Sequence, residues 1–200
     1  MENGQKTIFE LFSGEKRFIV PKYQRAYAWG NKEISDFLED IINQRHDKDY
    51  FLGTILFQDA SGVINGFEHI YIVDGQQRLT TIVIFMKALI GILSNNKMEK
   101  DLEREIRRYL KDKDVHKLEL IHPDNEFFKT YIIGDNEPDE KFLETPSQRK
   151  LLNAKKYFLE QLAKMNISDL IQYKNKVEKT KILTYSVRDD AEATLIFETT

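Results

Sequence analysis

The densest group of chemically able side chains lies at residues 74–81, which read DGQQRLTT. The segment holds a carboxylate, two amides, a guanidinium and two hydroxyls. The apolar run at residues 70–73 favours a strand, and apolar residues at helical spacing follow from Leu79. A strand that turns through Gly75 into a helix leaves backbone N–H groups unpaired at the positive end of the helix dipole, and this arrangement suits a phosphate.

Two interpretations of this segment stay open from the pattern alone. In the functional one, Gly75 and the helix start cradle a phosphate, Arg78 neutralises its charge, and Gln76 or Gln77 orients a water molecule. Asp74 would then hold a metal ion or fix Arg78 in place. In the structural one, Asp74 caps the helix, Gly75 makes a turn, and the other polar groups form a solvated first turn.

A second group lies in the loop at residues 21–29, PKYQRAYAW, which interleaves aromatic rings with cations and an amide. Tyr23 and Tyr27 suit stacking on a base or sugar, while Arg25, beside Gln24, suits pairing with a phosphate. The structural alternative puts the rings at the edge of the core and the cations at the surface. Trp29, the only tryptophan of the chain, fits packing better than contact with a ligand.

Two further patterns carry weaker signals. Gly53 interrupts a strand pattern, and a glycine there marks a bulge or the close approach of a ligand or of another backbone segment. Residues 188–190, RDD, with Glu192 beyond them, suit Mg²⁺ with phosphate co-ligands, but they suit a helix start better. The four histidines show no metal-ligand spacing. The chain has no cysteine, which excludes disulfides, thiolate zinc sites and thiol catalysis.

The composition is typical of a soluble globular protein. The 200 residues are 41% hydrophobic and 32% charged, enough for a substantial core. A net charge of −3 provides no overall basic field, so DNA contact would need a local patch or a part outside these residues. Residues 82–93, the longest apolar stretch, are interrupted by Lys87 and too short to span a bilayer. With no signal-peptide pattern, we expect a cytoplasmic protein without a membrane partner, and nothing excludes a homo-oligomer.

The elements that must position these groups follow from periodicity and turn residues. Helices are expected at residues 7–12, 31–45, 79–93, 98–110, 124–133, 147–165, 167–178 and 190–199, and strands at 17–20, 51–58, 67–73 and 181–187. Asn31 should cap the second helix, and residues 59–62, DASG, should form a turn between two strands.

The expected fold class is therefore α+β, with a small mixed sheet and packed helices followed by a mostly helical lobe. We place the nucleotide-binding lobe at residues 1–95 and the helical lobe at 96–200. The second lobe stops within a helical pattern, so we expect it to be truncated at its C-terminal end.

Three segments occur in order at fitting separations: VPKYQRAYAW at residues 20–29, YFLG at 50–53, and VDGQQRLTT at 73–81. Together they resemble the N-terminal domain of GmrSD-type restriction proteins, often called the DGQQR-motif family, whose core is related to the ParB partition protein and sulfiredoxin. The resemblance is strong over residues 7–93 and weaker beyond. It implies a ParB/sulfiredoxin-like lobe that binds and hydrolyses a nucleoside triphosphate with Mg²⁺ or another divalent cation.

Matching this family residue by residue gives a set of expected roles. Catalytic roles fall to Asp74, Gln76, Gln77 and Arg78, with Asp74 also at the metal. Nucleotide-binding roles fall to Tyr23, Gln24, Arg25, Tyr27, Gly53, Gly75, Thr80 and Thr81.

The resemblance also implies a biological setting. In this family, the nucleotide reaction gates restriction of modified foreign DNA, typically phage DNA, by a nuclease domain of the HNH kind further along the chain. The present chain stops before such a domain, so we expect no nuclease activity from it and DNA contact only through the full-length protein. The alternatives are a regulatory module that binds a nucleotide or DNA without hydrolysis, and a helical scaffold in which the signature only builds the fold.

Overall fold

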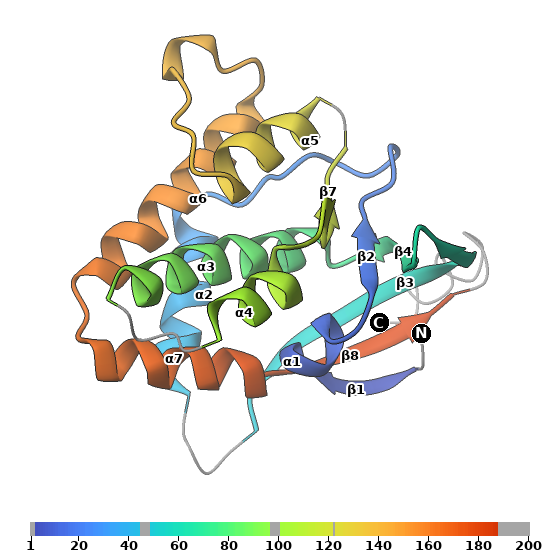
Figure 1. Ribbon diagram of the computed structural model, residues 1–200, viewed down its shortest axis with the longest axis horizontal. Helices are drawn as coiled ribbons and strands as arrows, with labels where there is room; N and C mark the ends of the chain where they lie inside the picture. Colours follow the sequence, from blue (N-terminus) through green and yellow to red (C-terminus); the bar gives the residue numbers. More distant parts are fainter. Residues whose placement is uncertain (1–2, 45–48, 97–100, 122, 188–200) are drawn as a thin grey trace.

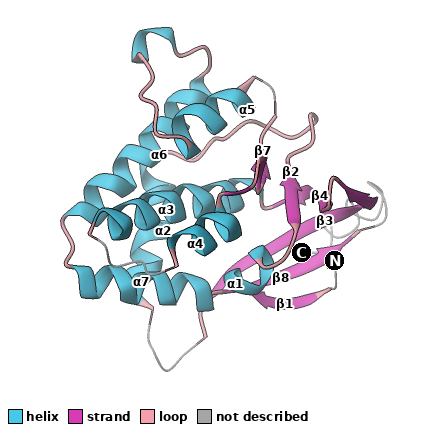
Figure 2. Ribbon diagram, viewed as in Figure 1, coloured by secondary structure: helices cyan, strands magenta, loops and turns pink. Residues whose placement is uncertain are grey.

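The computed structural model describes residues 3–44, 49–96, 101–121 and 123–187. Its helices gather on one side of the molecule and its strands on the other (Figure 2). The chain begins with β1 (Gly4–Thr7), α1 (Ile8–Phe12), β2 (Lys16–Ile19) and α2 (Asn31–Asn43). Thr7 caps α1, because its Oγ1 accepts the Glu10 N–H at 3.2 Å while the Glu10 carboxylate accepts the Thr7 N–H at 2.7 Å.

A long antiparallel hairpin, β3 (Phe51–Ile64) and β4 (Phe67–Asp74), forms the middle of the sheet. The turn expected at residues 59–62 is wrong, because β3 runs through them with a register shift and the chain reverses at Asn65-Gly66. These two residues have φ values of 53° and 82°. Asn-Gly adopts positive φ readily and matches the twist of a tight hairpin, whereas the upstream residues are absorbed as a bulge.

Within the described residues, six strands form one mixed sheet in the order β1-β8-β3-β4-β2-β7. Its last two members in chain order are β7 (Leu118–Glu119) and β8 (Lys181–Ser186), and a separate hairpin pairs β5 (Lys111–Asp112) with β6 (Val115–His116). Strand β8 lies between β1 and β3 (Figure 1). The two-lobe division near residue 95 stays a prediction. The two parts are joined by one sheet, because β1 to β4 come from before residue 95 and β7 and β8 from after it.

The helical side is built around α3 (Gln76–Asn95), which is buried almost all round. The remaining helices are α4 (Leu102–Tyr109), α5 (Asp124–Phe127), the π-helix η1 (Phe128–Ile133), the 3-10 helix η2 (Glu140–Phe142), α6 (Pro146–Ala163) and α7 (Ile167–Lys179). Edge-to-face rings join three of them: the Phe85 centroid of α3 lies 5.7 Å from that of Phe37 in α2 and 5.3 Å from that of Phe158 in α6. This packing fixes α3 against the helical layer.

The α+β fold class is confirmed, and most expected elements are present with ends shifted by a few residues. Two starts differ for local reasons. Helix α2 is capped by Gly30, with Asn31 as its first residue, and α3 begins at Gln76 because Gly75 already turns the chain. The helix expected at residues 190–199 lies outside the described residues.

Helix α3 is also long and apolar enough to cross a bilayer, and it is the one helix of the described residues that meets this criterion. However, 72% of its most apolar window is buried inside the fold. A helix that is apolar all round and covered by neighbouring elements is the central helix of a packed core. The stretch therefore serves as the core of this fold.

Candidate functional site

The site begins where β4 turns into α3. Gly75 lies between them with φ +88°, a left-handed conformation that favours glycine. A Cβ added there would lie 2.9 Å from Ile55 Cγ1 and 3.2 Å from the Thr54 carbonyl oxygen of β3. Both the conformation and the close approach of β3 thus require glycine. No side chain caps α3, so the alternative in which Asp74 serves as the helix cap is wrong.

Hydrogen bonds tie the loop between β2 and α2 to this turn. Gln24 Nε2 donates to the Val73 carbonyl at 2.7 Å, and Gln76 Nε2 donates to Gln24 Oε1 at 3.2 Å. Gln77 accepts the Ala28 N–H at 2.6 Å and donates to the Ala26 carbonyl at 3.1 Å. These hydrogen bonds therefore hold the loop against the turn between β4 and α3, although the two segments lie about fifty residues apart in the chain.

Arg78 lies between the helix start and β3. Its Nη1 donates to the Thr54 carbonyl at 3.0 Å. A Cβ on Gly53 would lie only 2.9 Å from the guanidinium carbon, so the glycine leaves the space that the guanidinium fills. Burial lowers the pKa of Arg78, and the neighbouring Asp74 and Tyr50 oppose that shift. An arginine side chain stays charged even when its pKa is lowered in this way, and the guanidinium N–H groups other than the one bonded to Thr54 remain available to a ligand.

A pocket of about 430 Å³ opens at this junction. It is lined by Gln24, Arg25, Trp29, Asp74, Gly75, Gln76, Gln77 and Arg78. The loop at residues 21–29 and the turn at residues 74–78 meet at this pocket, because Arg25 and Arg78 both line it. The Arg25 side chain is exposed and has no hydrogen bond or ion pair with any residue that the structure describes. The pocket thus presents one anchored and one unengaged guanidinium.

The structure keeps several expected binding residues away from this pocket. Tyr27 is buried, its hydroxyl donates to Thr81 Oγ1 at 2.8 Å, and the Thr81 hydroxyl donates to the Gln77 carbonyl at 2.8 Å. Burial raises the pKa of Tyr27. Thr80 is buried as well, and Tyr23 is 63% exposed outside the pocket lining. Tyr27 and Thr81 therefore join the loop to α3 through hydrogen bonds, Thr80 belongs to the buried part of α3, and Gly53 acts by making room for Arg78.

The two glutamines have different positions. Both amide ends of Gln77 are used to hold residues 26–28, so the expected role of orienting a water does not fit it. Gln76 uses its Nε2 on Gln24, while its Oε1 has no hydrogen-bond partner among the described residues. Of the two, Gln76 has the free acceptor that such a role needs. Trp29, for which the sequence favoured packing over contact with a ligand, both packs on the core and lines the pocket. Its aromatic type beside a cation-rich loop was the available signal.

A metal ion at this pocket would depend on Asp74, which is its one carboxylate among the described residues. No three His, Cys, Asp or Glu side chains in the described part of the chain gather closely enough to form a metal cage. Mg²⁺ commonly binds through one or two carboxylates together with substrate phosphates, so a single aspartate beside a phosphate site fits it. The carboxylate pair at residues 188–190 lies outside the described residues.

Comparison with known proteins identifies the family of this chain. The family model described as "GmrSD restriction endonuclease, N-terminal domain" matches residues 8–200. A search of curated proteins finds no match. The family match extends well beyond the segments 20–29, 50–53 and 73–81 and covers nearly all of the sequence. The chain therefore belongs to the family of N-terminal domains of GmrSD restriction endonucleases.

Proposed function

We propose that the pocket at the start of α3 binds a nucleoside triphosphate and hydrolyses it, as the nucleotide-responsive part of a cytoplasmic restriction protein that acts on modified foreign DNA. One observation carries the proposal: Arg25 and Arg78 come from distant segments and line the same pocket at an uncapped helix start. Two guanidinium groups and free backbone N–H groups are donors suited to phosphate oxygens. DNA contact and cleavage belong, in this proposal, to the full-length protein with its nuclease domain.

Each residue then has a role set by its surroundings. Arg78, anchored to the Thr54 carbonyl, neutralises phosphate charge from a fixed position, and exposed Arg25 does so from the pocket rim. The N–H groups in the first turn of α3 donate to no capping side chain and would donate to phosphate oxygens. Trp29 offers an apolar ring for the base.

Hydrolysis needs charge neutralisation and an oriented water molecule. Asp74 would hold a divalent cation, which neutralises charge on the transferred phosphoryl group when bound. Gln76 Oε1 would accept a hydrogen bond from the attacking water, because that oxygen is unengaged while both ends of Gln77 are used. Gln24 fixes the position of Gln76 through its own bond to β4.

The test is a titration of ATP, GTP, CTP and UTP, each with Mg²⁺, into the chain by calorimetry, followed by a phosphate-release assay. We expect Arg78→Ala to weaken binding by about 1.5–3 kcal/mol, the scale of a hydrogen bond to a charged group. Arg25→Ala should weaken it as well. Lys22→Ala is the matched control, because Lys22 is exposed in the same loop but does not line the pocket. Affinity unchanged in both arginine variants would remove the nucleotide from this pocket.

A second candidate is a module that binds the nucleotide and releases it unchanged. The observation that favours it is the engagement of Gln77, which leaves Gln76 and Asp74 as the only expected catalytic groups free to act beside Arg78 in the described pocket. The same assay separates the two functions. Binding lost in Arg78→Ala, with no phosphate release from the unmodified chain, would support the module.

A further inference from the structure

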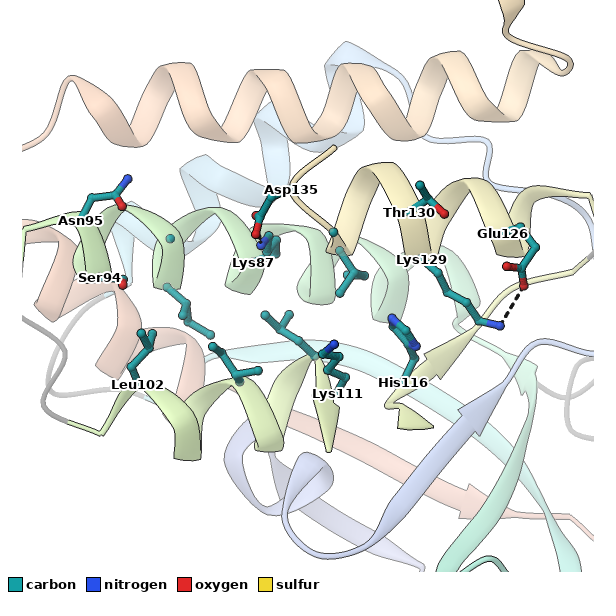
Figure 3. Close-up of a pocket in the computed structure, with 16 residues that line it drawn as sticks. Lys87, Ser94, Asn95, Leu102, Lys111, His116, Glu126, Lys129, Thr130 and Asp135 are labelled. Carbon is teal, nitrogen blue, oxygen red and sulfur yellow. Dashed lines mark hydrogen bonds and ion pairs between the residues drawn. The ribbon is translucent and has the colours of Figure 1, made fainter. Parts of the chain in front are cut away.

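A second and larger pocket, of about 760 Å³, lies along the C-terminal half of α3, away from the pocket at its start. Its walls come from α3, α4, the β5–β6 hairpin and the π-helix η1 (Figure 3). A volume in this range accommodates a small organic molecule. None of the motif residues 74–81 lines it.

The lining combines an apolar surface with charged groups. Ile90 of α3, Ile106 of α4 and Ile133 of η1 supply apolar surface from three sides. Ser94 and Thr130 add hydroxyl groups among the labelled side chains in Figure 3. Ligand sites typically show this combination of mostly apolar walls and a few convergent polar groups.

The charges in this pocket leave a positive excess. Both of its carboxylates are already paired: Asp135 with Lys87 at 2.7 Å and Glu126 with Lys129 at 3.0 Å. The Lys111 side chain, by contrast, has no hydrogen bond or ion pair with any described residue, although its backbone pairs with β6.

The pKa of His116, which lines the pocket, is also affected by this positive charge. Burial lowers the pKa of this imidazole first, and Lys129, Lys111 and Arg17 lower it further, against a small opposing effect of Glu126. An anionic group placed beside Lys111 and His116 would therefore be attracted without displacing an existing pair.

Gly91 provides an independent sign that space is kept open here. It lies inside α3, where glycine is less stable than alanine. Its φ is not positive, and a Cβ built on it would meet no atom within 4 Å. Neither the backbone nor a neighbouring side chain therefore requires glycine at this position, which faces the pocket.

The helix opposite Gly91 is unusual as well. Residues Phe128–Ile133 form a π-helix, a rare geometry that appears often at functional sites. It ends at Gly134, where an added Cβ would collide with the backbone carbonyl oxygen of Thr130. The π-turn places Lys129, Thr130 and Ile133 in the pocket wall.

We propose that this pocket is a second ligand site, which binds a small organic anion with an apolar body. The body would cover the isoleucine surface beside Gly91, and the anionic group would form an ion pair with Lys111 and accept a hydrogen bond from a ring N–H of His116. The proposal does not depend on nucleotide binding at the start of α3.

The test uses two fluorescent probes of the same shape: anilinonaphthalenesulfonate and phenylnaphthylamine, which lacks the sulfonate. We expect the sulfonate to bind the folded chain at least about tenfold more tightly than the neutral probe. Gly91→Leu should fill the pocket and weaken sulfonate binding at least about tenfold, whereas Gly91→Ala, which adds only a Cβ in open space, should change it less than about twofold.

A surface variant keeps the test decisive if Gly91→Leu fails to fold, as judged by circular dichroism. Lys111→Glu should weaken sulfonate binding about threefold to tenfold, while Lys32→Glu, a charge reversal at an exposed position outside the pocket, should not. Equal binding of the two probes, or equal effects of the two charge reversals, would overturn the proposal. So would a loss in Arg78→Ala as large as that in Gly91→Leu, because the probe would then occupy the pocket at the start of α3.

Discussion

The contact between Gly53 and Arg78 predicts that a single methyl group will weaken nucleotide binding. In Gly53→Ala the new Cβ would lie 2.9 Å from the guanidinium carbon and from Nη2, closer than such atoms approach in folded proteins. The guanidinium must move, and its bond to the Thr54 carbonyl is lost. If Arg78 pairs with a phosphate, the displacement removes about 1.5–3 kcal/mol of binding free energy, which is about a tenfold to hundredfold rise in Kd.

The same substitution also carries a cost in stability that must be separated from the effect on binding. Gly53 has φ +110°, which L side chains rarely adopt, so alanine there should lower the free energy of unfolding by about 1–3 kcal/mol. This backbone strain does not depend on residue 78. Urea denaturation of the single and double variants therefore measures the strain, and calorimetry at a temperature where each variant is folded measures binding.

A double-mutant cycle decides whether Gly53 acts through Arg78. In the Arg78→Ala background, Gly53→Ala should change Kd by less than about twofold, because no guanidinium remains to be displaced, giving a coupling energy of about 1.5–3 kcal/mol. Additive losses would refute the reasoning, since they would show that Gly53 affects binding by another route. An unchanged Kd in the Gly53→Ala single variant would refute it as well.

Two further predictions concern the loop and the pH dependence of stability. Gln77→Ala should lower the free energy of unfolding by about 1–3 kcal/mol and speed proteolysis within residues 22–30, because the Ala28 N–H loses its partner. Gln76→Ala is the control and should do neither, because among the described residues the Gln76 side chain bonds only the side chain of Gln24. Burial, and to a lesser extent nearby cations, lower the pKa of His116 below its ordinary value of 6.5. As the pH drops below 6.5, the unfolded chain therefore binds a proton at this residue before the folded chain does, and the free energy of unfolding should fall. His116→Gln should reduce that slope in urea denaturation at a series of pH values, leaving the part due to His69, whose pKa is also lowered by burial; an unchanged slope would contradict it.

Local patterns were sufficient to predict most of the elements. Apolar residues at helical spacing predict α3 and α6, because this signal acts within a few residues along the chain. The exception is the turn expected at residues 59–62, because Asn65-Gly66, a few residues further along, makes the turn instead. The pairing register of β3 with β4 decided it.

The sequence by itself determined which side chains are available to the site: the carboxylate, amides and guanidinium of residues 74–78 and the cation of Arg25. Only the tertiary structure decided which of them keep polar atoms free to contact a ligand there. Gln77 and Tyr27 have the right chemistry, but their polar atoms are used to join the loop to the helix, and Gly53 acts through the space it leaves for Arg78. These assignments depend on distances between segments far apart in the chain, and such distances are set by how the sheet and α3 pack rather than by any pattern of neighbouring residues.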